Sequence, residues 1–382
     1  MAAHDLVDVL NRRYRTYFTQ RRPVSFGLQR AGTLHTFGPD QPAFTITVND
    51  DRGAKALASL DQLQVAMAYL KGSLDLDGDL VTALSMRKFF PDLHPIAWLG
   101  RFAPALLRGG KEHDRRSISA HYDRDPDFFL TFMDRRHRCY TQGVFARDDE
   151  PLEDAMTRKM DIAIDAVGVK PGDHVLEVGG GWGAFVEYAG KRDIKVTTLT
   201  LSEESERYLN DLVDRERLPV TVVRQHLLGY RSDQRYDAIV NMGVTEHLPD
   251  YRATLRKYAE LLKPGGNIYL DALAMRAKHR VSTFMSRYIY PGGSSPLLLH
   301  EYLRRVAGSP FQLTSVFDER HNYHLTCKAW AQRLDAARED VVRRWGDPLY
   351  RRFRLFLWGS AAGFATGQVQ AYRWVLHLPP SA

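Results

Sequence analysis

The stretch His174-Val-Leu-Glu-Val-Gly-Gly-Gly-Trp-Gly-Ala184 decides the fold of this chain. Its first five residues are mostly apolar and predict a buried strand, and the run of glycines predicts a tight turn that opens a helix. Three later segments, separated by helical stretches, also have the pattern of strands: Lys195–Thr200, Tyr236–Met242 and Asn267–Leu270. Strands that alternate with helices form βαβ units. The second part of the sequence therefore predicts an α/β fold with a doubly wound, mainly parallel sheet.

The glycine-rich turn by itself is compatible with more than one ligand. Gly179, Gly181 and Ala184 match the G-x-G-x-x-A pattern of nicotinamide dinucleotide enzymes, but such turns also occur in methyltransferases or only as packing features. Glu177 stands two residues before the first of these glycines. A carboxylate at this place repels a pyrophosphate, so it favours a ligand with a cationic amino-acid tail.

Two segments after the turn narrow these alternatives. Tyr236–His247 is a strand that ends in Glu-His, and Leu261–Leu270 carries Lys-Pro-Gly-Gly between a helix and a further strand. Together with the turn, they resemble the Rossmann-like class I methyltransferases that use S-adenosylmethionine and release S-adenosylhomocysteine. At the end of the second strand, the carboxylate of Glu204 is expected near the ribose hydroxyls. The cofactor-binding residues that the resemblance implies are Tyr140, Thr141, Glu177, Gly179, Gly181, Trp182, Gly183, Thr200, Leu201, Ser202, Glu204, His226 and Leu227.

A series of shorter segments makes the resemblance more specific. The segments, in order, are His121–Phe129, Tyr140–Phe145, Leu152–Ala155, Arg287–Gly293, Tyr323–Trp330 and Gly363–Gly367. This series resembles the family of cyclopropane-fatty-acid synthases and mycolic acid cyclopropane synthases, whose members transfer a methyl group from S-adenosylmethionine to the double bond of a lipid acyl chain. The resemblance implies an enzyme that modifies an unsaturated acyl chain of a phospholipid. Two alternatives stay open: a methyltransferase acting on a soluble natural product, and a degenerate homologue that only binds lipid.

The chemistry of this family requires a dry, aromatic site and a base. An alkene that attacks a methyl group leaves a carbocation on the acyl chain, and aromatic faces stabilise such a charge. Removal of a proton from the new methyl group closes a cyclopropane. Removal from elsewhere, or after a hydride shift, gives a methyl-branched or methylene product.

The residues expected at the base site depart from the family pattern. In the family the base is generally thought to be a bound bicarbonate, held by a Cys, a Glu, two His and a Tyr. Glu246, His247 and Tyr323 match that set, whereas Gln142 stands at the Cys position and Asp271 stands where a His is usual. The candidate catalytic residues are these five and His121, which opens the first of the matching segments.

The carboxylate of Asp271 at an anion site suggests a changed base. A negative charge repels bicarbonate, so we expect bicarbonate to bind weakly or not at all. Asp271 or Glu246 is then the base supplied by the protein. The alternative is that Asp271 only bonds a neighbour or points away from the site.

Composition and charge bound the remaining possibilities. The 382 residues are 44% hydrophobic and 26% charged, which is typical of a globular protein, and the net charge is +7. Cys139 and Cys327 are the only cysteines, which excludes a disulfide scaffold and a cysteine zinc cluster, and we assign no metal site. The sequence has no signal peptide pattern and no apolar run long enough for a membrane span. We therefore expect a cytoplasmic protein that is peripheral at the inner face of the membrane.

The basic residues concentrate outside the predicted catalytic part. They gather in Arg12–Arg22 and Arg101–Arg116, where they would attract an anionic membrane surface. No motif that reads a nucleic-acid groove is present, so we expect no nucleic-acid partner. We divide the chain into a smaller α+β N-terminal accessory domain at 1–100, a basic linker at 101–120 and the methyltransferase domain with a lipid-substrate cap at 121–382. Family members with an extra N-terminal domain often dimerise, so a homodimer is also implied.

Overall fold

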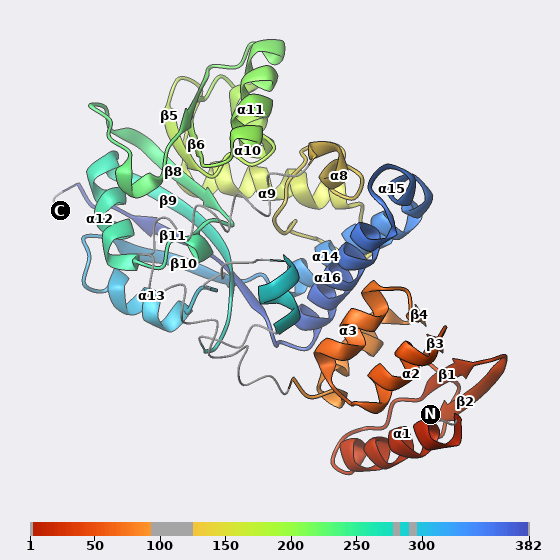
Figure 1. Ribbon diagram of the computed structural model, residues 1–382. Helices are drawn as coiled ribbons and strands as arrows, with labels where there is room; N and C mark the ends of the chain where they lie inside the picture. The colour runs from red at the N-terminus through yellow and green to blue at the C-terminus, as the bar shows by residue number, and fades with distance from the viewer. Residues whose placement is uncertain (1–2, 93–124, 278–282, 290–295, 381–382) are drawn as a thin grey trace.

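The protein contains two separate sheets. The computed structural model describes residues 3–92, 125–277, 283–289 and 296–380 (Figure 1). A seven-stranded sheet with the order β10-β11-β9-β8-β5-β6-β7 forms the catalytic part, and a four-stranded sheet lies in the N-terminal part. No helix within these ranges is both long and apolar enough to cross a membrane.

The seven-stranded sheet confirms the predicted α/β fold. Neighbouring strands from β9 to β7 are parallel, and β11 runs antiparallel to both β9 and β10. The strands are β5 (His174–Val178), β6 (Lys195–Thr200), β7 (Val220–Arg224), β8 (Tyr236–Met242), β9 (Leu262–Ala274), β10 (Gln312–Asp318) and β11 (Gln370–His377). The predicted strand Asn267–Leu270 is the centre of the longer β9. Strands β7, β10 and β11 were not predicted.

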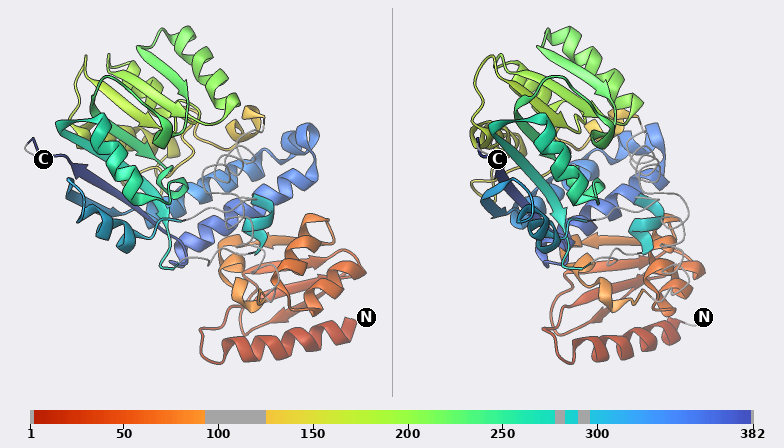
Figure 2. Two further views of the ribbon diagram at one scale, coloured as in Figure 1. Left: turned by 60° about the vertical axis from the view of Figure 1, so that its left-hand side comes forward. Right: turned by 90° about the vertical axis from the view of Figure 1, so that its left-hand side faces the viewer.

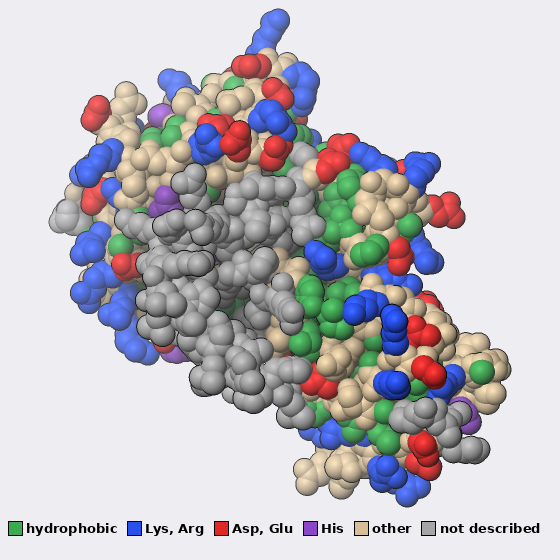
Figure 3. All heavy atoms as spheres, viewed as in Figure 1, with side chains coloured by type: hydrophobic (Ala, Val, Ile, Leu, Met, Phe, Trp, Pro, Cys, Tyr) green, Lys and Arg blue, Asp and Glu red, His purple; other side chains and the backbone are tan. Residues whose placement is uncertain are grey.

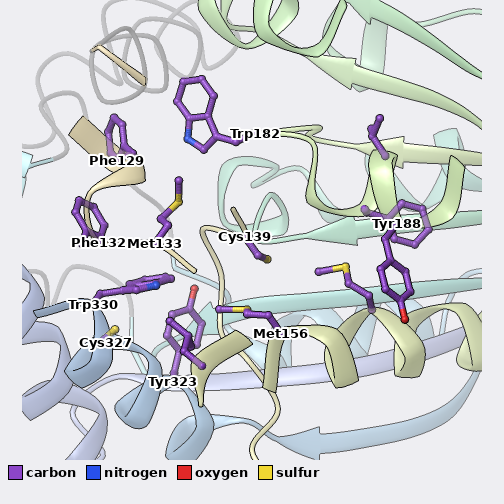
Figure 4. Packing of buried hydrophobic residues seen from close by; sticks show 14 of the residues in the cluster. Phe129, Phe132, Met133, Cys139, Met156, Trp182, Tyr188, Tyr323, Cys327 and Trp330 are labelled. Atoms are coloured by element: carbon purple, nitrogen blue, oxygen red, sulfur yellow. The ribbon is translucent and has the colours of Figure 1, made fainter. Parts of the chain in front are cut away.

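Helices cover both faces of this sheet because its strands alternate in the direction of their side chains. Val175 packs in the core under α9 (Leu152–Val167), α10 (Ala184–Gly190) and α11 (Glu203–Glu216), whereas its neighbour Leu176 packs under α12 (Tyr251–Leu261) and α13 (Leu299–Val306). The first of these cores continues into the helices α8 (Pro126–Leu130), α14 (Arg320–Ala336), α15 (Arg338–Trp345) and α16 (Asp347–Ala365). Figure 4 shows the junction, where Trp182 and Met156 of the sheet side face Phe132 and Trp330.

The N-terminal part has its own core. Its sheet has the order β2-β1-β3-β4, with β1 and β3 parallel and the other pairs antiparallel. Leu10 and Tyr17 of the first helix, α1, are buried in the same core as residues of this sheet. Both turned views in Figure 2 place α1 at the outer edge of the molecule. The elements are α1 (Ala3–Phe18), β1 (Phe26–Arg30), β2 (Thr33–Phe37), β3 (Phe44–Val48), α2 (Asp51–Ala58), α3 (Gln62–Leu70), β4 (Leu74–Gly78), α4 (Leu80–Ser85) and the 3-10 turn η1 (Arg87–Phe89).

Two arginines of α16 attach the N-terminal part to the catalytic part. The Arg351 guanidinium lies 2.8 Å from Asp75 and donates to the backbone oxygens of Tyr69 and Leu74. Arg354 donates to the backbone oxygen of Leu76 at 3.0 Å. These contacts fix β4 and α3 against α16. The predicted linker at 101–120 lies outside the described residues, so that boundary stays a prediction.

Candidate active site

The first cavity lies at the carboxyl ends of β5, β6 and β8, where ligands bind in open parallel sheets. It has a volume of about 150 Å³, and the turn after β5 forms one of its walls. We call it the glycine-loop cavity. Most of the cofactor-binding residues predicted from the sequence lie around it: Tyr140, Thr141, Glu177, Gly179, Gly181, Trp182, Thr200, Leu201, Ser202, His226 and Leu227.

Glycine is required in the turn itself because a side chain has no room there. A Cβ atom on Gly179, whose φ is +93°, would lie 2.3 Å from Cγ2 of Val244, and one on Gly180 would lie 2.4 Å from Oγ1 of Thr198. Gly183 was predicted to bind the cofactor, but it is not part of the cavity wall. Its Cβ would lie 2.4 Å from Leu212, so the close packing of α10 against α11 accounts for this glycine.

The polar wall of the cavity combines a carboxyl group with hydroxyl groups. Glu177 is buried and accepts a hydrogen bond from Oγ1 of Thr198 at 2.6 Å, and burial raises the pKa of Glu177 to about 7. Ser202 caps α11, and Oγ of Ser205 donates to the backbone oxygen of Gly181 at 2.8 Å.

Glu204 does not take the place beside the ribose that the sequence predicted. It lies outside the cavity wall and forms an ion pair with Arg207, one turn further along α11. Ser205 lines the cavity instead. The residue three positions after a helix cap returns to the side of the cap, and this spacing from Ser202 was the signal that sequence reasoning missed.

These residues fit S-adenosylmethionine. The cavity beside the glycine turn provides space for a ligand, and the carboxyl group of Glu177 in its wall suits the cationic amino-acid tail. The hydroxyls of Ser202 and Ser205 suit a ribose, and the imidazole of His226 and the apolar side chain of Leu227, which also line the cavity, suit an adenine. Nδ1 of His226 already accepts a hydrogen bond from the backbone of Leu228 at 3.1 Å, which fixes the ring.

The second cavity lies between the catalytic part and the N-terminal part. It has a volume of about 310 Å³ and is lined mainly by apolar side chains of β1, β3, α3, α4, α14 and α16. We call it the apolar cavity. It shares Tyr140, Thr141, Gly243 and His247 with the glycine-loop cavity, so the two cavities are neighbours.

Three predicted catalytic residues, Glu246, His247 and Tyr323, line the apolar cavity. Glu246 lies on the short turn η3 (Thr245–His247), and its Oε1 accepts a hydrogen bond from the backbone of Leu273 at 2.8 Å. Burial raises the pKa of Glu246 to about 8, and the nearby charge of Asp271 acts in the same direction. Burial also lowers the pKa of His247 to about 4, so its imidazole is neutral near pH 7.

Asp271 and Gln142 lie behind the wall of the site. Both are fully buried, and neither is part of the lining of either cavity. Nζ of Lys159 is 3.0 Å from Oδ2 of Asp271 and also donates to Oγ1 of Thr141. This placement argues against Asp271 as the base and favours the alternative in which it bonds a neighbour. For Gln142, both side-chain polar atoms lack a hydrogen-bond partner among the described residues.

The structure also brings forward residues that the sequence analysis passed over. Cys327 and Trp330 line the apolar cavity from α14, the helix that carries Tyr323 (Figure 4). Their spacing of four and seven residues from Tyr323 was the available signal, because it places all three on one helix face. Burial raises the pKa of the Cys327 thiol, which makes it unreactive. His121 lies outside the described residues.

Comparison with known proteins agrees with this geometry. Residues 110–374 match the family model of mycolic acid cyclopropane synthetase. Sphingolipid C9-methyltransferase of Candida albicans is 26% identical over 377 residues, covering 93% of this chain and 71% of that protein. Tuberculostearic acid methyltransferase of Mycobacterium tuberculosis is 29% identical over 305 residues, covering 73% of this chain and 70% of that protein.

A solved structure extends the comparison to the cofactor. The crystal structure of a mycolic acid cyclopropane synthase in complex with S-adenosylhomocysteine and CTAB superposes with a TM-score of 0.64 at 26% identity, and covers 69% of this chain and 98% of that one. The family match spans more than half of the sequence. The chain therefore belongs to the mycolic acid cyclopropane synthetase family, whose enzymes are methyltransferases that use S-adenosylmethionine.

Proposed function

We propose that the protein transfers the methyl group of S-adenosylmethionine to the double bond of an unsaturated acyl chain of a phospholipid. The observation that carries this proposal is the shared wall of the two cavities, formed by Tyr140, Thr141, Gly243 and His247. S-adenosylmethionine in the glycine-loop cavity and an acyl chain in the apolar cavity would come together at these shared residues. The apolar lining also keeps water away from a reactive cation.

Aromatic residues at the junction suit a cationic intermediate on the acyl chain. S-adenosylmethionine supplies an electrophilic methyl group when it is bound. One alkene carbon would bond to that methyl group while the sulfur–methyl bond breaks and S-adenosylhomocysteine leaves with its electron pair. The neighbouring alkene carbon would then carry the positive charge. The rings of Tyr140 and Trp330 stack with centroids 5.2 Å apart, and both line the apolar cavity together with Tyr323. Aromatic faces near the cation lower its free energy.

Glu246 is the base in this proposal. It lines the apolar cavity, and its Oε2 has no hydrogen-bond partner among the described residues. A pKa of about 8 is close to neutral pH, and this gives a strong base with a useful ionised fraction. Proton loss from the transferred methyl group closes a cyclopropane. Proton loss from a neighbouring chain carbon gives a methyl-branched alkene, and a hydride shift followed by proton loss from the methyl group gives a methylene chain.

The test uses the purified protein, S-adenosylmethionine with a 13C-labelled methyl group, and vesicles of dioleoylphosphatidylglycerol. We expect mass spectrometry to show one labelled CH2 unit added to an acyl chain, and NMR of the recovered lipid to distinguish a ring from a branch. Binding of S-adenosylmethionine without transfer to lipid would overturn the proposal and favour the degenerate homologue. Transfer to a soluble compound alone would favour the natural-product alternative.

A bicarbonate titration tests the identity of the base. If Glu246 removes the proton, turnover is independent of added bicarbonate at constant pH. Strong stimulation by bicarbonate contradicts a carboxylate base. The ion pair with Lys159 neutralises Asp271, so the repulsion that the sequence suggested is weaker than a free carboxylate would produce.

We also propose that the protein reaches its substrate at an anionic membrane surface. Arg12, Arg15 and Arg22 are exposed on and just after α1, and Figure 3 shows further Lys and Arg side chains gathered along the edge that α12 and α13 form. Each basic residue near such a surface contributes about 1 kcal/mol. Sedimentation with anionic vesicles that is lost at high salt supports this proposal, and salt-independent binding contradicts it. The homodimer and the exclusion of nucleic acid stay predictions.

A further inference from the structure

The N-terminal domain forms one wall of the apolar cavity. Lining residues from Phe26 to Phe90 precede residue 110, where the match to the family model begins. Arg351 and Arg354 of α16 hold this wall in place through hydrogen bonds to Tyr69, Leu74 and Leu76. A ligand in this cavity therefore contacts both parts of the molecule.

Most charged or ionisable groups in this lining are neutralised. Asp75 is paired with Arg351 at 2.8 Å and accepts a hydrogen bond from Asn49 at 2.7 Å. Glu246 is largely protonated at neutral pH and His247 is uncharged, because burial disfavours the charged form of each.

Arg87 is different. Its guanidinium is half-buried and lines the cavity from η1, and no hydrogen bond or ion pair joins it to any residue in the described ranges. The nearest acidic influence is Asp92, whose carboxylate accepts hydrogen bonds from the backbone and hydroxyl of Thr283 at 2.9 to 3.0 Å. An arginine without a partner in an apolar wall is costly unless a ligand supplies the anion.

We propose that Arg87 is a specificity residue that pairs with the phosphate of an anionic lipid whose acyl chain occupies the apolar cavity. The inference rests on the proposed function and narrows it, because it names the charge of the headgroup. The chemistry on both sides is complementary. A phospholipid has a long apolar chain with a phosphate at one end. The cavity has apolar walls and, among the described residues, one lining guanidinium that no hydrogen bond or ion pair engages. Arginine binds phosphate through two parallel N–H···O hydrogen bonds.

The first arm of the test measures binding without turnover. Dodecyl phosphate, dodecanol and inorganic phosphate are titrated by calorimetry into the full chain and into three variants. Arg87→Gln removes the charge, and Arg87→Lys keeps it. Lys88→Gln removes a charge one residue away on an exposed side chain and is the matched control.

We expect Arg87→Gln to weaken dodecyl phosphate binding about tenfold or more and to leave dodecanol binding unchanged. Arg87→Lys restores most of the lost affinity, and Lys88→Gln matches the wild type. The proposal is overturned if Arg87→Gln binds dodecyl phosphate as the wild type does, or if it weakens both amphiphiles equally. Inorganic phosphate binding as tightly as dodecyl phosphate also overturns it, because the site would then recognise free phosphate.

The second arm measures turnover on vesicles of unsaturated phosphatidylglycerol. We expect Arg87→Gln to raise KM with little change in kcat and with unchanged affinity for S-adenosylmethionine. A fall in kcat alone contradicts a role in headgroup binding. If the wild type binds dodecyl phosphate through Arg87 but transfers no methyl group to lipid, the proposed function fails while the anion site stands.

Discussion

The glycine-loop cavity and the apolar cavity share a wall, but the chain builds them in opposite ways. The first is assembled largely from turns that follow β5, β6 and β8, so its main residues come from a few short segments. The second takes its lining from positions as far apart as Phe26 and Val369. Local sequence motifs can therefore predict a binding site at strand ends. A cavity lined by residues far apart in the sequence forms only when the chain folds and brings these residues together.

The largest effect is expected at Glu246, in the wall of the apolar cavity. Glu246→Gln keeps the shape of the side chain but cannot accept a proton, so turnover should fall by about 10²–10⁴-fold. Because Glu246 lines only the apolar cavity, affinity for S-adenosylmethionine should stay close to the wild-type value. Steady-state kinetics and calorimetry measure the two quantities. The control is Glu204→Gln, which removes a carboxyl group outside both cavities and should be nearly neutral.

The sequence predicts those site residues that belong to local motifs, and it fails for residues whose role depends on contacts between distant parts of the chain. The turn at Gly179, the strand end at Glu246 and the position of Tyr323 were all predicted, because each belongs to a short motif. Asp271 was predicted to lie in the active site, but it is buried behind the cavity wall and paired with Lys159. Lys159 is distant in the sequence, so no local motif indicates this ion pair. The role of Arg87 could not be predicted for a related reason. Arg87 lines a cavity only because α16 packs against the N-terminal part of the chain.

The strands, too, were predicted where the local sequence pattern is clear and missed where it is not. The strands β5, β6 and β8 are central, apolar and flanked by turns, so they were predicted with their observed bounds. The edge strand β10 has mostly exposed side chains, so its alternation of apolar and polar residues carries no clear signal. Strand β11 pairs antiparallel with β9, although α13, β10, α14, α15 and α16 lie between the two strands in the sequence. Local patterns do not indicate such a long-range pairing.

The glycine turn offers the next largest effect, and it acts on the first cavity alone. In Gly179→Ala the new Cβ clashes with Val244 at a backbone φ of +93°, so the turn must shift and affinity for S-adenosylmethionine should fall by about 10²-fold, a loss of some 3 kcal/mol. Calorimetry checks the affinity. Gly168→Ala has a similar strain, at φ +71°, but no atom within 4 Å of the new Cβ, so it serves as the control. Equal losses in both variants would contradict the steric argument.

A smaller effect is expected in the pH dependence of kcat, which the ionisation of Glu246 should control. A base acts in its deprotonated form, and burial raises the pKa of Glu246 to about 8. With both substrates saturating, kcat should rise about tenfold per pH unit below 8 and level off above it. Saturation matters because Glu177 titrates near 7 and would otherwise contribute through cofactor binding. A profile that is flat from pH 6 to pH 9 is incompatible with Glu246 as the base.

The smallest effect tests whether the apolar cavity holds the acyl chain. Gly359 lies on α16 in the lining, and a Cβ added there meets no atom within 4 Å, so the side chain of Gly359→Leu extends into the cavity. Activity on long acyl chains should fall several-fold, and shorter chains should be affected less. The helix should become more stable by about 1 kcal/mol, because glycine is unfavourable in a helix interior. Gly359→Ala gives nearly the same gain in stability without filling the cavity, and it should keep its activity. The pair separates the two causes: a loss of activity in both variants would point to the flexibility of α16, whereas a loss confined to leucine assigns the space beside Gly359 to the substrate.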